Sequence, residues 1–142
     1  MSQPLSARAR RRWLLLAALA VPAGLFLLYR FEPSADSFYP RCLFHTATGL
    51  HCPGCGTTRC LHALLHGQFR QAAAYNALTL LALPFLLFWA GRWSLAFLRG
   101  VPLRPRPLPR WAYVVLLGAV LGFWVLRNLN VPPFDGLAPH QL

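Results

Sequence analysis

Residues 71–91 read QAAAYNALTLLALPFLLFWAG and contain no charged side chain. Apolar character continues beyond Arg92 as far as Leu98. A segment of this length and composition is typical of a helix that crosses a bilayer, since such a helix needs about 17–25 apolar residues. Pro84 lies inside it, but proline is tolerated in membrane helices because neighbouring helices and water satisfy the carbonyl that it frees. We therefore expect a kinked membrane span over residues 77–98.

Two further apolar runs predict spans over residues 13–29 and 111–127. The first contains Pro22, and the second is bounded by Arg110 and Arg127, whose long side chains can snorkel to the membrane surface. The first run also resembles the core of a signal peptide, and the arginines at 10–12 give it a weak twin-arginine pattern. Residues 30–35, however, lack a small-x-small cleavage site, which favours an uncleaved anchor.

The charge of the chain is strongly positive and unevenly placed. All 14 basic residues are arginines, and only three acidic residues oppose them, giving a net charge of +11. Such a balance is compatible with nucleic-acid binding, but the arginines flank the apolar runs, so we expect no nucleic-acid partner. The positive-inside rule places residues 1–12 and 99–110 in the cytoplasm. Residues 30–76 and the short tail 128–142 then lie outside, as in a protein of the bacterial inner (cytoplasmic) membrane.

The cytoplasmic connector, residues 99–110, reads RGVPLRPRPLPR and contains four prolines. Proline removes a backbone donor and fixes its own φ, so this segment cannot form an ordinary helix. We interpret it as a stiff, extended linker between the second and third spans.

The external segment contains a box of two cysteines, CPGCGTTR, at residues 52–59. Two thiols at this spacing can share a metal ion or form a redox-active disulfide, and Gly54 and Gly56 allow the tight turn between them. Zinc is the metal that such a pair suggests, with Cys42 as a third ligand. Candidates for the fourth ligand are His45, His51, Cys60, His62 and His66.

A short helix is expected after the box. Thr57 or Thr58 can cap its N-terminus, and Gly67 can end it, whereas residues 37–49 show little helical period. At about 100° per residue the helix has two faces. Its polar stripe comprises Arg59, His62, His66 and Arg70, and its apolar side comprises Leu61, Leu64, Leu65 and Phe69. This pattern predicts an amphipathic helix at the membrane surface, or a re-entrant one.

Three chemical hypotheses remain open for the external segment. The cysteines can form a structural centre, either zinc or a static disulfide; Cys52 and Cys55 can exchange electrons as a dithiol; or Arg59, His62 and His66 can line a transport path. Gly56 after the second cysteine disfavours a c-type haem, and no glutamate lies between His62 and His66 to make a metalloprotease signature. Enzymatic activity has no positive support.

Several motifs together resemble a family of small bacterial membrane proteins, the domain of unknown function two-seven-five-two. They are Phe38-Tyr39-Pro40-Arg41-Cys42, the run from Thr48 to Arg59, Leu64-Leu65-His66-Gly67, Asn76, Leu126-Arg127-Asn128 and Pro133-Phe134. The resemblance implies a few membrane helices around the cysteine box and adds Asn76 to the polar residues of interest. It brings no established activity, substrate or cofactor. Cys60 stands where a small apolar residue is expected, and Ala77 where proline is common.

The sequence thus predicts an all-α integral membrane protein with about three spans and a short amphipathic or re-entrant helix after the cysteine box. Its expected partners are the lipid bilayer and another membrane protein or a second copy of itself. The favoured function is a non-enzymatic one, an accessory or interaction subunit with an external cysteine centre. The alternatives are a membrane thiol–disulfide oxidoreductase and a small transporter or channel component.

Overall fold

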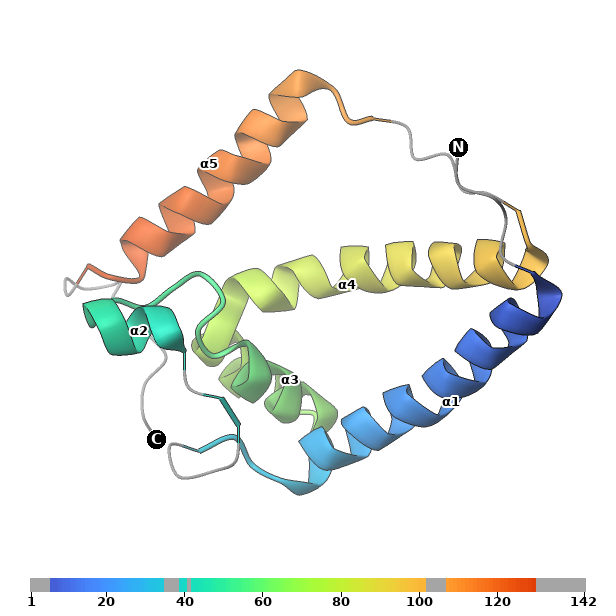
Figure 1. The fold of residues 1–142 in the computed structure, drawn as a ribbon. Helices are drawn as coiled ribbons and strands as arrows, with labels where there is room; N and C mark the ends of the chain where they lie inside the picture. The colour runs from blue at the N-terminus through green and yellow to red at the C-terminus, as the bar shows by residue number, and fades with distance from the viewer. Residues whose placement is uncertain (1–5, 35–38, 41, 102–106, 130–142) are drawn as a thin grey trace.

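The computed structural model describes residues 6–34, 39–40, 42–101 and 107–129. All regular structure within these ranges is helical, so the predicted all-α class is confirmed for the part of the chain that the structure describes. The elements are α1 (Ala7–Arg30), α2 (Leu43–Thr48), α3 (Thr57–Leu65), α4 (Phe69–Arg99) and α5 (Arg110–Leu126) (Figure 1). Residues 102–106 of the predicted linker and 130–142 of the predicted tail lie outside the described residues.

Within the described ranges, two helices, α1 and α4, are long and apolar enough to cross a membrane. Both run through their internal prolines, Pro22 and Pro84, without ending. The third apolar helix, α5, is shorter, with 17 residues. No residue in the apolar stretch of α1 is fully buried against the rest of the described protein, although Leu14 and Leu28 are half-buried, and large side chains on all three helices are exposed. Examples are Leu19 at 72%, Phe85 at 70% and Val114 at 70% exposure.

The protein core is small and lies where α3 packs on the N-terminal part of α4. Its buried members are Cys60, Ala63, Ala72 and Tyr75, with Leu64 and Leu80 packed against them. The small residues allow the two helices to approach closely. The packed side of α3 therefore centres on Cys60 and Ala63. Of the predicted apolar side, Leu61 and Leu64 are half-buried, whereas Leu65 and Phe69 are exposed.

Asn76 interrupts α4 with non-helical backbone angles, φ −163° and ψ 94°. Its side-chain oxygen accepts a hydrogen bond of 2.9 Å from the backbone N–H of Thr79, as the N-cap of a helix does. Asn76 thus ends a short first segment of α4 and caps the long apolar segment that follows. Because the carboxamide nitrogen remains available, it can bond to another part of the chain.

Two local features differ from the sequence-based expectation. A six-residue helix, α2, forms within residues 37–49, where little helical period is present; Gly49, at φ 72°, ends it in the left-handed conformation. The N-cap of α3 is Gly56, without a side-chain cap, instead of Thr57 or Thr58. The hydroxyl of Thr57 bonds instead to the hydroxyl of Thr79 at 2.9 Å, which joins α3 to α4.

The elements converge at one end of the structure. In Figure 1 the C-terminal end of α5 lies beside α2 and the loop that leads into α3, although these segments are far apart in the sequence. Hydrogen bonds between Asn128 and His51, and between Arg127 and Cys52, confirm this proximity. The cysteine box therefore lies where α2, α3, α4 and the end of α5 meet.

Candidate functional site

Three cysteine sulfurs lie together at this junction. Cys42 is the N-cap of α2, and Cys52 and Cys55 are on the loop before α3. The Sγ atoms of Cys42 and Cys52 are 3.4 Å apart, those of Cys52 and Cys55 are 3.1 Å apart, and all three lie within 4.8 Å of one another. None of them is in a disulfide. Sulfurs around a tetrahedral zinc ion are separated by about 3.8 Å, given Zn–S bonds of about 2.3 Å. This cluster could hold a metal ion.

The loop between Cys52 and Cys55 is folded so that a backbone amide points at a sulfur. The N–H of Cys55 donates to the carbonyl of Cys52 at 3.1 Å, which closes the turn. The N–H of Cys52 donates in return to the Sγ of Cys55 at 3.2 Å. Gly56, at φ 81°, then reverses the chain into α3, a conformation that favours glycine. Amide donation to sulfur stabilises negative charge on it, as around metal-bound thiolates.

Arg127 holds this loop from the end of α5. Its side chain is 1% exposed. Nη1 donates to the carbonyls of Cys52 and Pro53 at 3.0 and 3.2 Å, and Nη2 donates to the carbonyl of Cys55 at 3.1 Å. The guanidinium also lies 5.1 Å from the centre of the Phe123 ring. A rigid guanidinium can satisfy several carbonyls at once, which the ammonium of lysine cannot do in the same geometry.

Two asparagines complete the support of the loop. The Nδ2 of Asn76 donates to the carbonyls of Pro53 and Cys55 at 2.9 and 3.0 Å. The Oδ1 of Asn128 accepts from the N–H of His51 at 2.8 Å, and its Nδ2 donates to the carbonyl of His51 at 2.9 Å. Residues 51–55 belong to no helix or strand, so their backbone groups lack the partners that regular structure supplies. Side chains from α4 and from the end of α5 supply these partners instead.

The electrostatic environment differs between the cysteines. Burial raises the pKa of Cys55 to about 12. The pKa of Cys42 is lowered, chiefly because the backbone N–H of His45 donates to its sulfur. In the absence of a metal ion, the thiol of Cys42 is therefore deprotonated more readily than the thiol of Cys55. Arg127 brings a buried positive charge to the cysteine loop. Glu32, the acidic residue among those described, lines the smaller pocket and not the cavity beside the sulfurs.

A cavity of about 540 Å³ opens beside the sulfurs. The three cysteines, His45, His51 and Arg59 all contribute to its wall. The rings of His45 and His51 are stacked, with centroids 4.5 Å apart. Neither imidazole belongs to the group of ligand atoms within 4.8 Å that the three sulfurs form. The structure therefore places these two predicted ligands next to the cluster without including them in it.

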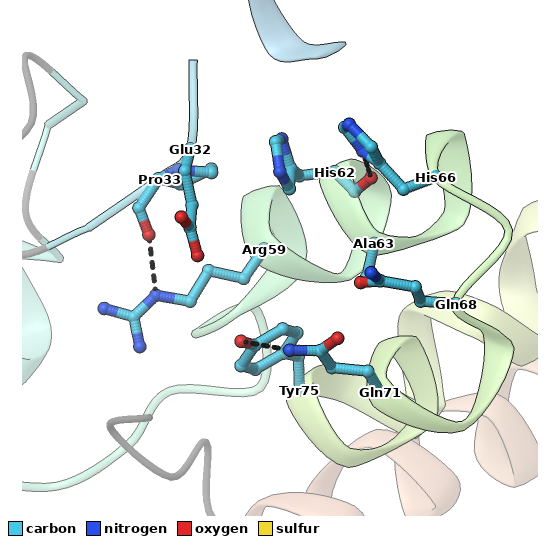
Figure 2. A pocket seen from close by; sticks show the side chains of 9 residues that line it. All are labelled: Glu32, Pro33, Arg59, His62, Ala63, His66, Gln68, Gln71 and Tyr75. Carbon is cyan, nitrogen blue, oxygen red and sulfur yellow. Dashed lines mark hydrogen bonds between the residues drawn. The ribbon is translucent and has the colours of Figure 1, made fainter. Parts of the chain in front are cut away.

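The other predicted ligands lie elsewhere. Figure 2 shows His62 and His66 on the wall of a smaller pocket of about 200 Å³ between the end of α1, α3 and α4. The Nδ1 of His62 lies 2.6 Å from the carbonyl of Leu28, and His66 stacks on Tyr29 with centroids 4.4 Å apart. Both histidines therefore fasten α3 to α1. The sulfur of Cys60 is buried in the core and bonds to the carbonyl of Asn76 at 3.6 Å.

The expected role of Arg127 is wrong. A snorkelling arginine at the end of a membrane span keeps its charge in water, whereas Arg127 is buried and bonds to three carbonyls of the cysteine loop. The sequence places Arg127 and Asn128 more than seventy residues from the box, so no spacing rule connects them. The only signal was that both belong to the motifs that resemble the family.

We predict that Arg127→Lys destabilises the protein by about 2–3 kcal/mol, because lysine keeps the charge but leaves buried carbonyls without a donor. Arg110→Lys is the matched control, since Arg110 is exposed at the start of α5, and it should change stability by no more than about 0.5 kcal/mol. Reversible unfolding in detergent measures both. Equal stabilities of the two variants would contradict the assigned role of Arg127.

Comparison with known protein families gives a match over part of the chain. Residues 42–90, about a third of the chain, match the family described as Protein of unknown function (DUF2752). The matched stretch begins at Cys42 and includes Cys52, Cys55 and Asn76. No curated protein and no solved structure matches the chain. The resemblance predicted from the sequence is therefore confirmed over residues 42–90.

Proposed function

We propose that Cys42, Cys52 and Cys55 hold a zinc ion in a non-enzymatic membrane protein, where the metal joins the cysteine loop to the helices. The observation that carries this proposal is the convergence of three unbonded sulfurs, from two separate segments, within 4.8 Å. Thiolates are soft ligands that suit zinc. The second segment is in turn fixed by Arg127, Asn76 and Asn128, as is usual for the surroundings of metal ligands.

The buried charge of Arg127 supports a metal–thiolate centre. A buried arginine needs an anionic partner, because an uncompensated charge in the protein interior is costly. No carboxylate among the described residues forms an ion pair with Arg127, and its guanidinium instead contacts the loop that carries Cys52 and Cys55. A divalent zinc ion with three thiolates has a net charge of −1, so the metal centre and Arg127 together would be neutral.

The membrane arrangement is also a proposal. The exposed apolar surfaces of α1 and α4 favour lipid contact, and we propose that α5 is a third span, since exposed arginines flank its connector. The arginine distribution then places the N-terminus and residues 99–110 in the cytoplasm, with the metal centre on the outer side of the bacterial inner membrane. Exposed helix surfaces also suit an accessory subunit that contacts another membrane protein or a second copy of this chain.

A dithiol function of Cys52 and Cys55 is the second candidate, favoured by the 3.1 Å between their sulfurs. Against it, burial raises the pKa of Cys55 and reduces the thiolate available for exchange in the metal-free protein, whereas a bound zinc ion would itself deprotonate the thiol. Metal and disulfide make opposite predictions for the number of free thiols, so one preparation of protein distinguishes them.

We predict about one zinc ion per chain in protein purified in mild detergent without reductant. The metal should be lost in Cys42→Ser, Cys52→Ser and Cys55→Ser, because each removes one of the ligands. Cys60→Ser is the matched control and should keep the metal, since Cys60 lies in the core between α3 and α4. Elemental analysis together with thiol titration measures both quantities. Metal-free protein with two fewer thiols than the four encoded would support the disulfide instead.

The proposed topology predicts that a reporter active only outside the cytoplasm works when it follows residue 142 and fails when it is inserted between residues 107 and 109. The reason is that α5 would carry the chain from the cytoplasm to the outer side. A reporter active only in the cytoplasm should give the reverse pattern. The same activity at both positions would show that α5 does not span the membrane.

A further inference from the structure

The proposed metal centre has three protein ligands, one fewer than a closed structural zinc site. Among the described residues, the potential ligand atoms that lie within 4.8 Å of one another are the sulfurs of Cys42, Cys52 and Cys55. No histidine nitrogen belongs to this group. The Nδ1 of His45 lies 3.3 Å from the carbonyl of Leu50, which occupies that nitrogen with a backbone contact. One coordination position is therefore left to something other than these side chains.

The open position faces the larger cavity. All three cysteines belong to the wall of this cavity, so an ion held between their sulfurs would be reached from it. Its volume of about 540 Å³ is within the range of small-molecule sites, about 300–1,000 Å³. Cys55 is 8% exposed and Cys42 and Cys52 are half-buried, so the cavity is the route by which a molecule would approach the sulfurs.

The cavity favours an anion. Arg59 lies on its wall, and the Nε of Arg59 donates to the carbonyl of Pro33 at 2.9 Å, which fixes the guanidinium. Figure 2 shows this bond and the guanidinium directed away from His62 and His66. Within the described ranges, neither Nη atom of Arg59 has a hydrogen-bond partner, and the described lining residues include no carboxylate. Two terminal nitrogens of a fixed cation are thus available to a ligand.

We propose that the fourth coordination position of the metal takes a small monoanionic ligand from this cavity, through a thiolate or a carboxylate, with Arg59 pairing with its charge. The inference rests on the proposed metal centre. Arg127 would offset the net charge of the zinc–thiolate centre, and Arg59, which also lines the smaller pocket with Glu32, would offset the charge of the added anion. The protein would then be a receptor for small anions at its metal.

Cobalt(II) substitution tests the open position, because cobalt bound by thiolates has visible bands that change with its fourth ligand. Detergent-purified cobalt protein is titrated, without oxygen, with acetate in one series and 2-mercaptoethanol in another. We expect a saturable change of the bands with at least one of them, which also distinguishes a carboxylate from a thiolate. Arg59→Gln should weaken this binding about tenfold, the effect of losing a hydrogen bond from a charged donor. Arg59→Lys, which keeps a cation, should weaken it less.

The matched control is Arg70→Gln, since Arg70 is exposed at the start of α4 and is not part of the cavity wall. It should bind the anions as the unchanged protein does. The thiolate-to-cobalt bands of each variant before titration show that its metal site is intact. The open position would be overturned if neither anion changed the bands. It would also be overturned if His45→Ala or His51→Ala altered the bands before any anion was added. Either result would leave the metal centre in place. Equal weakening by Arg70→Gln and Arg59→Gln would overturn the role of Arg59. Absence of thiolate-to-cobalt bands would contradict the metal centre itself.

Discussion

The guanidinium of Arg127 donates hydrogen bonds to three backbone carbonyls of residues 52–55, and the arrangement of the cysteine box depends on these bonds. A loop of this kind has no ladder or helical partner for its carbonyls, and buried carbonyls without a donor are costly. Side chains must therefore supply the donors. Because Arg127 follows α5 directly, the same bonds also join α5 to the remainder of the described structure.

Asn76 has a related role at the other side of the loop. A carboxamide carries both a donor and an acceptor, and Asn76 uses the acceptor to cap the apolar part of α4 and the donor to hold Pro53 and Cys55. The break in α4 and the position of the box thus have one cause. Neither aspartate nor leucine could do both, since aspartate lacks the donor and leucine lacks both groups.

The sequence predicted the helical class and the apolar helices well, because an uncharged run of membrane length permits few other structures. The spacing of Cys52 and Cys55 predicted the turn that brings their sulfurs together. Contacts between distant segments were harder to predict. His62 and His66 have the spacing of two ligands on one helix face. That face packs against α1, however, and the Nδ1 of His62 bonds to the carbonyl of Leu28. Arg127 was assigned to the membrane surface because only the folded chain brings it beside a loop more than seventy residues earlier.

The sulfur cluster is proposed to be a metal centre with one ligand that the protein does not supply. X-ray absorption at the zinc edge, on protein purified without chelator, tests this claim most directly because it counts the ligands by element. In protein prepared without added thiol, we expect three sulfurs at about 2.3 Å and one oxygen at about 2.0–2.2 Å, without the outer-shell scattering of an imidazole. Zinc without a sulfur shell, zinc with an imidazole in its first shell, or zinc with four sulfurs in protein prepared without added thiol would contradict it.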